Sequence, residues 1–388
     1  MLPFSYHLTP SIKFGCSLAS ELGEELISVC AEKRVVIISD PGVTAAGLAD
    51  AVLASLEKAG FAADLFNDLR GESSAGQIDA AAEMIRALRP AAVIGLGGGS
   101  ALDVAKLATV LSVGDHRAEY YALMNQPLPQ RTSKLIMLPT TAGTGAEVTR
   151  TAVFNNADNR KVWAWGDELA ADLVILDPEL TLTLPKLLTA ATALDAMVHA
   201  IEACSAKNSN PLVQAFGLHA IRLISQNLEK TFEQPQDLDT RGRLLMASTL
   251  AGMAIDAAGT GIAHAIGHAL GTIAGIHHGR AAALALKVVF LKNAEAAAGI
   301  HSEIALALGV QAGSAPIEKH ARMGAQAFGD FVRRTGIEMS LKPDGLTRKD
   351  LDRLVDAIHS KENTPMLENN CYCASEADIR EFARQILS

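Results

Sequence analysis

Apolar and polar residues alternate in regular blocks along the first 150 positions of the chain. The segment "KRVVIISD" at 33–40 is a continuous apolar run that ends in Ser-Asp, which is typical of a buried parallel strand. The segment "TAAGLADAVLASLEKAG" at 44–60 has helical spacing and ends in glycine. This strand–helix alternation predicts an α/β domain with a parallel sheet. The further elements predicted in this half are, in chain order, a strand at 62–68, a helix at 76–90, a strand at 91–100, a helix at 101–113 and a strand at 133–147 that runs into a polar, Gly-rich loop.

The pattern changes after "LVILDPELTLTLP" at 173–185. From position 187 onward the chain consists of long Ala- and Leu-rich stretches with helical spacing and few strand candidates. The joint lies near 180–186, without a low-complexity linker. We therefore predict an α/β plus all-α fold, with a dinucleotide-binding domain at 1–182 and a helical metal-binding domain at 183–388.

Composition narrows the possible partners and the compartment. The formal net charge is −9 and there is no basic run, so we expect neither nucleic acid nor an anionic membrane as a partner. No uncharged apolar run reaches about 18 residues without Gly or His breaks, so no membrane-spanning helix is predicted. The five cysteines are few and odd in number, and the first ten residues lack the pattern of a secretory signal. Cys371 and Cys373 form the only close cysteine pair, which is a weak metal signal. We expect a cytoplasmic protein.

A glycine-rich segment, "GLGGGSALDVAK" at 95–106, is the first chemical motif. A predicted strand leads into Gly97, Gly98 and Gly99, and a helix begins at about Ser100. Glycines allow close approach of the backbone, and the helix N-terminus offers free N–H groups, which together suit a pyrophosphate. A turn of this kind also occurs for tight packing alone. It is not the usual GxGxxG fingerprint, which belongs in the first strand-to-helix turn, here "SDPGVT".

Polar residues follow two other predicted strands. Asp40 closes the first strand, where a carboxylate can bind an adenosine ribose and repel a 2′-phosphate. Thr140, Thr141 and Thr144 follow a later strand, and ligands of open α/β sheets bind at such carboxyl ends. The alternatives are a turn aspartate before Pro41 and an ordinary polar loop.

Histidines are concentrated in the second half, in apolar surroundings. Asp195 and His199 are four residues apart in a predicted helix, so they share one face of it. His264 and His268 repeat this spacing, and His278 follows a break at Gly275. A single histidine of this kind is usually a core residue with satisfied hydrogen bonds, but burying several unpaired imidazoles is costly. One carboxylate and three imidazoles could bind Fe²⁺, Zn²⁺, Co²⁺ or Ni²⁺. Spacing alone does not decide between His264 and His268 as the ligand.

Five segments together resemble the iron-containing (group III) alcohol dehydrogenases: "GGGSALDVAK", "LPTTAGTGAEVT", "LDPELTLTLP", "TAATALDAMVHAIEA" and "HAIGHALG…HHG". The resemblance implies a dinucleotide-binding α/β domain, a helical domain and an active site in the cleft between them. Asp195, His199, His264 and His278 would be the metal ligands, with Fe²⁺ expected first and Zn²⁺ or another divalent ion as alternatives. His268 would be the catalytic, non-ligand histidine near the nicotinamide. The NAD-binding residues implied are Asp40, Gly97, Gly98, Gly99, Ser100, Asp103, Thr140, Thr141, Thr144, Lys161 and His278.

The implied activity is metal-assisted hydride transfer between NAD(H) and a small alcohol or aldehyde, including hydroxy acids and semialdehydes. A homodimer or larger homo-oligomer is expected. One alternative is an enzyme like the glycerol dehydrogenases or dehydroquinate synthases, which share the fold. The synthases should surround the metal with several Lys and Arg, whereas only Arg280 and Lys287 lie near these ligands in the sequence. Another alternative is an inactive nucleotide-binding module, which should lack a metal ligand.

Some segments depart from the pattern of the family. "GESS" at 71–74 stands where many members have Pro-Asn-Pro-Thr, which removes an asparagine contact to the cofactor. Ala101 and Ala269 replace usual prolines, and "GRAAALALKVVF" after His278 differs from the usual sequence. The substrate pocket is therefore expected to differ from that of well-known members.

Overall fold

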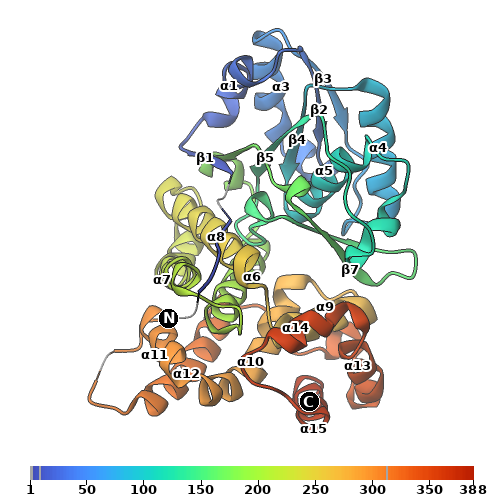
Figure 1. Ribbon diagram of the computed structural model, residues 1–388. Helices are drawn as coiled ribbons and strands as arrows, with labels where there is room; N and C mark the ends of the chain where they lie inside the picture. The colour runs from blue at the N-terminus through green and yellow to red at the C-terminus, as the bar shows by residue number, and fades with distance from the viewer. Residues whose placement is uncertain (1–2, 8–9, 312) are drawn as a thin grey trace. The chain divides into compact units, whose positions relative to one another are not determined.

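The first half of the chain forms the predicted parallel sheet. In the computed structural model (Figure 1), six parallel strands lie in the order β1-β8-β5-β4-β2-β3. The structure describes residues 3–7, 10–311 and 313–388. The strands of the sheet are β1 (Ser11–Phe14), β2 (Arg34–Ile38), β3 (Ala62–Phe66), β4 (Ala92–Gly97), β5 (Lys134–Pro139) and β8 (Leu173–Leu176).

Helices cover both faces of this sheet. The α-helices of this half are α1 (Leu22–Val29), α2 (Pro41–Ala45), α3 (Leu48–Lys58), α4 (Ala75–Leu88) and α5 (Gly99–Leu111). On one face, Val35 and Ile37 of β2 share a buried cluster with Leu26 of α1 and Val52 of α3. On the other face α5 packs so closely on β4 that a methyl group on Gly95 would lie 3.0 Å from Ala105 Cβ. The central strands are therefore buried on both sides, which explains their continuous apolar runs.

Three features of this half differ from the predicted elements. The helix predicted over 44–60 is two helices, because Gly47 between them has a φ of 75°, in the left-handed region that favours glycine. Strand β1 was not predicted, since a four-residue strand at the sheet edge carries no long apolar run. The antiparallel ribbon of β6 (Thr151–Asn155) and β7 (Lys161–Trp165) was also missed. Burial alternates along β6, as in a strand with only one covered face, but not along β7.

The second half is helical, as predicted, with no strand after β8 among the described residues. Its α-helices are α6 (Lys186–Ser205), α7 (Pro211–Glu233), α8 (Leu238–Ala258), α9 (Ile262–Ala274), α10 (His278–Ala296), α11 (Ala298–Ala307), α12 (Ile317–Thr335), α13 (Leu351–Ile358), α14 (Thr364–Asn369) and α15 (Glu376–Ile386). The fold is thus α/β plus all-α. Eight short 3-10 helices are also described: η1 (Leu18–Glu21), η2 (Ala118–Met124), η3 (Ala146–Val148), η4 (Asp167–Leu169), η5 (Pro178–Thr181), η6 (Lys342–Asp344), η7 (Arg348–Asp350) and η8 (Lys361–Asn363).

Contacts divide the chain into two compact units that are not two uninterrupted halves. The sheet unit comprises Leu8–Leu184 and Gln236–Leu245, so it includes the start of α8. The helical unit comprises Pro185–Pro235, Met246–Ser388 and the described part of Met1–His7. Each unit is therefore completed by a segment that is distant in sequence.

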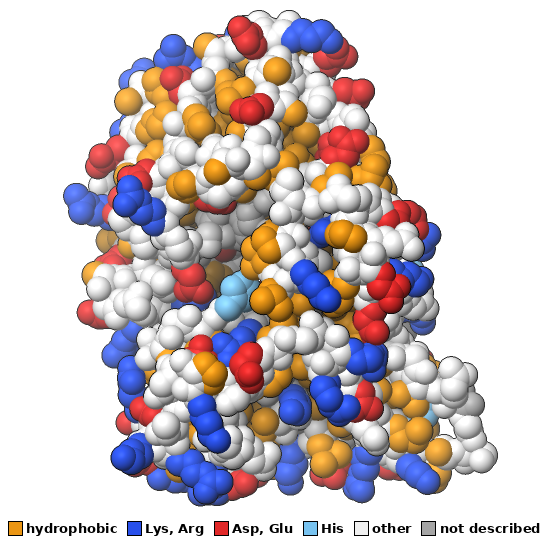
Figure 2. Space-filling view, turned by 180° about the vertical axis from the view of Figure 1, so that it is seen from behind, with side chains coloured by type: hydrophobic (Ala, Val, Ile, Leu, Met, Phe, Trp, Pro, Cys, Tyr) orange, Lys and Arg blue, Asp and Glu red, His pale blue; other side chains and the backbone are white. Residues whose placement is uncertain are grey.

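One helix in the described residues, α6, is long and apolar enough to cross a membrane. Its most apolar 18-residue stretch is 89% buried inside the protein, as in a core helix. The bent pair α8 and α9 meets the same criteria only if it is counted as one broken span. On the face shown in Figure 2, acidic and basic side chains are interspersed. Residues 1–2 and 8–9 of the N-terminal stretch, where no secretory signal was predicted, lie outside the described residues.

Candidate active site

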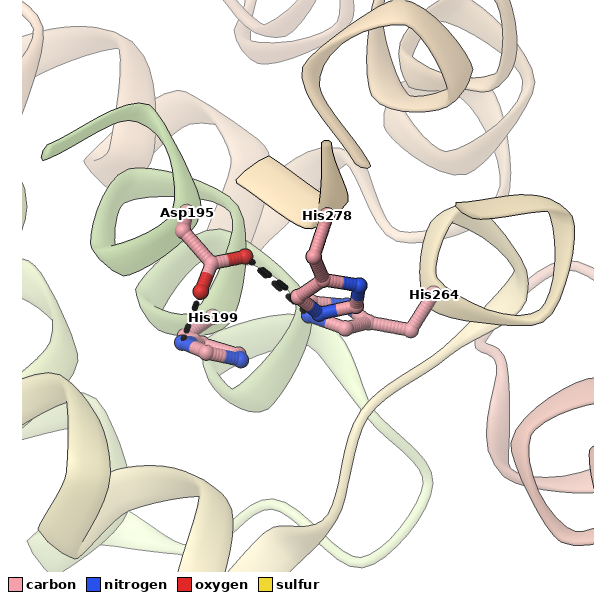
Figure 3. Close-up of side chains that lie close together, drawn as sticks. All are labelled: Asp195, His199, His264 and His278. Carbon is pink, nitrogen blue, oxygen red and sulfur yellow. Dashed lines mark ion pairs between the residues drawn. The ribbon is translucent and has the colours of Figure 1, made fainter. Parts of the chain in front are cut away.

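Four side chains from three helices of the helical unit converge on one point. Asp195 and His199 lie one turn apart on α6, His264 comes from α9, and His278 is the first residue of α10 (Figure 3). Each offers one ligand atom, and these atoms lie within 4.8 Å of one another. The Asp195 carboxylate lies at the centre of the group. Its Oδ1 is 3.5 Å from His278 Nε2 and 4.0 Å from His264 Nε2, and its Oδ2 is 4.0 Å from His199 Nδ1.

This donor set fits a divalent metal ion. Three imidazoles and one carboxylate are the ligands that first-row divalent metals take in catalytic sites. Asp195, His199 and His264 are buried, with Asp195 3% exposed, whereas the side chain of His278 is 22% exposed. Asp195 Oδ1 accepts no hydrogen bond from the described residues, and a buried carboxylate oxygen in that state requires a compensating positive charge. An ion among the four side chains would supply that charge.

The other two histidines of this region lie outside the group. His268 is one turn further along α9 and buried, with its ring centroid 5.3 Å from that of His278 and 6.5 Å from that of His264. His277 is exposed and precedes the first turn of α10. The structure therefore brings His264, and not His268, into the group with Asp195.

A glycine lets α10 approach α6 closely enough for this convergence. Gly279 follows His278 directly, and a methyl group on it would overlap the carbonyl oxygen of Ala191 on α6. The same methyl group would lie 3.1 Å from Asp195 Cβ. A residue larger than glycine would push the start of α10, and with it His278, away from Asp195.

A second buried carboxylate lies beside the group and was not predicted from the sequence. Glu202 of α6 is 2% exposed, and its Oε2 lies 2.5 Å from His264 Nδ1. The signal was present in the sequence, because positions 195, 199 and 202 follow the i, i+4, i+7 spacing of one helix face.

The predicted nucleotide residues of the sheet unit gather at the point where the strand order reverses. The chain runs from β2 to β3 on one side and from β4 through β5 to β8 on the other, so the reversal lies between β2 and β4. Ligands of open α/β sheets bind outside the carboxyl ends of strands at such a point. Asp40 follows β2 and Gly97 ends β4, and a methyl group on Gly97 would lie 3.3 Å from Asp40 Oδ2.

The two oxygens of Asp40 have different surroundings. Oδ1 accepts hydrogen bonds from the backbone N–H groups of Gly42 (2.8 Å) and Val43 (3.0 Å), so Asp40 caps α2. Oδ2 is the oxygen that lies near Gly97. The turn-aspartate interpretation and the ligand interpretation are therefore compatible, since each concerns a different oxygen.

The glycine turn packs against the threonines that follow β5. A methyl group on Gly98 would lie 3.3 Å from Thr141 Cγ2, and one on Gly99 would lie 2.6 Å from Thr144 Cγ2. The Thr140 N–H donates to Gly97 O at 2.9 Å and extends the pairing of β4 with β5. Ser100 lies in the first turn of α5, whose N-cap is Gly98. Larger residues would fill this turn, so its glycines leave a bare backbone beside a helix N-terminus, as a pyrophosphate requires.

Two further predicted residues are held in ion pairs. Asp103 Oδ1 lies 2.8 Å from Nζ of Lys106, a completely buried lysine, and its Oδ2 accepts the Val153 N–H at 3.1 Å. Burial raises the pKa of the Asp103 carboxyl, and Lys106 opposes that shift. Lys161 Nζ lies 2.8 Å from Oε1 of Glu72, in the segment "GESS" that departs from the family pattern. Glu72 thus approaches a residue predicted to contact the cofactor.

The sheet with a glycine turn at its reversal point and the buried metal-type cluster define a class, the metal-dependent nucleotide-linked oxidoreductases. Comparison with known families agrees with this class. The profile of "Iron-containing alcohol dehydrogenase" matches residues 9–178, and that of "Fe-containing alcohol dehydrogenase family, C-terminal" matches residues 189–387.

Individual relatives cover nearly the whole chain. Long-chain-alcohol dehydrogenase 1 of Geobacillus thermodenitrificans is 34% identical over 351 residues, which is 90% of this chain and 88% of that protein. Sulfoacetaldehyde reductase of Bilophila wadsworthia is 30% identical over 383 residues, or 97% of each. The crystal structure of sulfoacetaldehyde reductase from Bifidobacterium kashiwanohense in complex with NAD+ superposes with a TM-score of 0.89 at 28% identity and covers 100% of both chains.

The chain belongs to the iron-containing alcohol dehydrogenase family. It is an oxidoreductase that depends on a divalent metal and transfers hydride between NAD(H) and a small alcohol or aldehyde. The resemblance found in the sequence is thereby confirmed at the level of family, fold and reaction.

Proposed function

We propose that Asp195, His199, His264 and His278 bind the catalytic divalent ion, with Fe²⁺ as the native metal. The proposal is carried by one observation, the convergence of these four ligand atoms within 4.8 Å, with three of the four residues buried. When bound, the ion would supply a Lewis acid for the substrate oxygen, and NAD(H) would carry the hydride. The four side chains would hold the ion.

We propose that His268 moves the proton of the reaction. Its ring is buried beside His278 without belonging to the ligand group, which suits a histidine that exchanges a proton with the substrate side of the site. His278 would then contact both the ion and the nicotinamide.

We propose that the sheet domain, 1–182, binds NAD and that the helical domain, 183–388, binds the metal. Gly97, Gly98, Gly99 and Ser100 would hold the pyrophosphate at the start of α5. Asp40 Oδ2 would accept hydrogen bonds from the adenosine ribose. The remaining cofactor contacts would come from Asp103, Thr140, Thr141, Thr144 and Lys161.

Arg280 argues against a dehydroquinate-synthase-like activity. Its guanidinium donates to both carboxylate oxygens of Asp344, at 2.9 and 2.8 Å, and to the carbonyl oxygens of Glu338 and Ser340. The bonds from Arg280 to its carboxylate lower the pKa of Asp344. All four bonds engage the arginine within the protein, so it is not available to an anionic substrate. Lys287 is exposed on α10.

The main experiment removes metal from the purified full-length chain with a chelator and restores Fe²⁺, Zn²⁺ or Co²⁺ under anaerobic conditions. NADH oxidation is then followed against a panel of short aldehydes, semialdehydes and hydroxy-acid precursors. We expect turnover only in metal-loaded protein, with the best substrate a small aldehyde. A chain that binds no divalent ion would instead be an inactive nucleotide-binding module.

A second experiment tests the cofactor preference. We expect NADH to bind more tightly than NADPH, because Asp40 places negative charge where the 2′-phosphate would lie. Asp40→Gly should reduce this preference by about tenfold or more, since like-charge contacts cost several kcal/mol. Asp40→Asn is the sharper variant, because its amide oxygen still caps α2 while the charge is removed. Tighter binding of NADPH than NADH to the unmodified protein would contradict the role of Asp40.

We also propose that the protein acts in the cytoplasm as a homodimer or larger homo-oligomer. All five cysteines are free, which agrees with a reducing compartment. Sedimentation velocity of the metal-loaded protein tests the oligomeric state.

A further inference from the structure

Glu202 is a buried carboxylate whose side-chain hydrogen bonds, among the described residues, go to the start of α9. It lies on α6 three residues after His199, and its side chain is 1% exposed. Its Oε2 lies 2.5 Å from His264 Nδ1 and also accepts the Gly261 N–H at 2.9 Å. Its Oε1 accepts the Ala263 N–H at 2.6 Å. The side chain therefore binds both the first N–H groups of α9 and the histidine that follows them.

These contacts fix how the His264 ring is presented. Nδ1 faces Glu202, whereas Nε2 lies on the opposite side of the ring, 4.0 Å from Asp195 Oδ1. A carboxylate beside Nδ1 can only accept, so the ring proton lies on Nδ1 and the lone pair lies on Nε2. That tautomer is the one in which Nε2 can bind a metal ion.

We propose that Glu202 is the positioning residue of the metal site, which holds His264 in the orientation and tautomer that bind the ion. This inference rests on the proposed metal site. Glu202 touches neither substrate nor cofactor in the proposal, and it acts through His264.

Charge supports the same role. A divalent ion among three neutral imidazoles and Asp195 would leave one positive charge without a compensating negative charge. Glu202 lies behind His264 and would provide the second negative charge, so that the loaded site as a whole would be neutral. The positive end of the α9 dipole further stabilises the carboxylate at this position.

Glutamine is a close structural substitute that cannot reproduce this arrangement. Both oxygens of Glu202 accept a backbone N–H, so the amide NH₂ that Glu202→Gln introduces would face a donor in either orientation. If the NH₂ faces His264, it donates to Nδ1 and moves the ring proton to Nε2, which then cannot bind a metal. Glu202→Gln therefore removes one charge and disturbs the tautomer at nearly constant volume.

Asn370 provides a matched control at the same helix terminus. Its Oδ1 accepts hydrogen bonds from the Ile262 N–H and from Asn293 Nδ2, each at 3.3 Å. Among the described residues, Asn370 makes no hydrogen bond to His264. Asn370→Ala thus weakens the support of the α9 N-terminus without removing the partner of the histidine.

The experiment uses metal-free, full-length wild type, Glu202→Gln and Asn370→Ala. Each protein is titrated with Co²⁺ alone while the visible absorption of the bound ion is recorded. The thermal unfolding of each metal-free protein is measured separately. We expect both variants to lower the Tm. We expect Glu202→Gln to raise the Kd for Co²⁺ by about 10–100-fold and to change the ligand-field spectrum, as loss of an outer partner of a metal-binding histidine does. Asn370→Ala should leave the Kd and the spectrum unchanged.

Equal Co²⁺ affinity and spectra in wild type and Glu202→Gln would overturn the inference and reduce Glu202 to a helix cap. Wild-type protein that binds no Co²⁺ would overturn the proposed metal site itself, so the two failures are distinguishable. If Glu202→Gln does not fold, Glu202→Asp replaces it, because its shorter carboxylate cannot reach Nδ1 and the backbone together. An unchanged Co²⁺ affinity in that variant would equally overturn the inference.

Discussion

Two groups of histidines in the helical unit differ in what surrounds them. His199, His264 and His278 converge on Asp195, and Glu202 lies behind them. His301 of α11 and His320 of α12 are as buried as His199 and His264, at 0% and 6% exposure, whereas His278 is half-buried. Their hydrogen-bond partners are neutral: His301 Nδ1 lies 3.1 Å from Ala297 O, and His320 Nδ1 lies 2.9 Å from Ser302 Oγ.

The difference shows which property of a buried histidine indicates chemistry. Burial lowers the pKa of His301 to about 4, and the Ala297 carbonyl opposes this only in part, so the ring is neutral at pH 7. It packs edge-on against Phe290 as an apolar aromatic residue, with ring centroids 5.3 Å apart. The first group instead directs ring nitrogens at a shared buried carboxylate. Convergence on a charge, rather than burial, distinguishes a metal site from core packing.

The largest expected effect is the loss of bound metal, which should occur on substitution in the first group of histidines but not in the second. His264→Ala or His278→Ala should lose the bound ion, and kcat/KM should fall on the order of 10³-fold or more, because the Lewis acid contributes several kcal/mol. Elemental analysis beside steady-state kinetics checks this. His301→Gln and the exposed His277→Ala are the controls and should retain the metal. Retention of metal in His264→Ala would remove the distinction between the groups.

His268 should behave as a third kind of histidine, inside the site but not a ligand. His268→Ala should keep the metal, and kcat should fall by about 10²–10⁴-fold if it performs general acid–base catalysis. The same two measurements apply. Loss of metal in His268→Ala together with retention in His264→Ala would reverse the assignment of the two residues.

His301 should affect the pH dependence of the free energy of unfolding rather than the activity. Its folded pKa of about 4 lies below the ordinary histidine value of 6.5, so the unfolded chain binds a proton that the folded chain excludes. Its contribution to the free energy of unfolding is therefore complete above pH 6.5 and falls between pH 6.5 and about 4, by about 3 kcal/mol in total. Urea unfolding of wild type and His301→Gln across this range checks the difference.

The difference in unfolding free energy between wild type and His301→Gln should shrink toward acid pH. His359→Gln, at an exposed histidine, is the matched control. A difference for His301→Gln that stays constant from pH 7 to pH 4 would show that this histidine is not held neutral by burial.

The smallest expected effect concerns a glycine in the helix that carries a histidine of each group, Gly279 of α10 and Gly299 of α11. Gly279→Ala should destabilise the protein by about 1–3 kcal/mol and weaken metal binding, because the methyl group overlaps Ala191 O and displaces His278. Gly299→Ala on α11 meets no atom within 4 Å and should stabilise by about 0.4–1 kcal/mol. Thermal unfolding with and without Zn²⁺ checks both. Equal metal affinity in wild type and Gly279→Ala would show that α10 can shift without loss of the site.

The amino-acid pattern is sufficient to define the class of each half and the pairing of residues within one helix. Continuous apolar runs alternating with helical patterns predict a parallel sheet, because a strand covered by helices on both faces is apolar at nearly every position. The spacing of Asp195 and His199 places them on one face of any helix that forms there. Short elements such as β1 and the β6–β7 ribbon were not predicted, since four or five residues are too few for a periodic pattern to distinguish a strand from a loop.

Which residues of different helices meet depends on tertiary packing alone. His264 and His268 are equivalent in spacing, and the packing of α9 beside α6 is what directs one of them at Asp195. The sequence does not distinguish Gly279 from other glycines, and its importance follows only from the packing of α10 on α6. Glu202 likewise resembles a surface residue of a helix in the sequence, but the start of α9 covers it in the structure. The same holds for Asp40 and Gly97, which lie more than fifty residues apart in the sequence and become neighbours through the order of the strands. Local periodicity fixes the face on which a side chain lies, whereas the partner on that face depends on helix and strand packing across the whole unit.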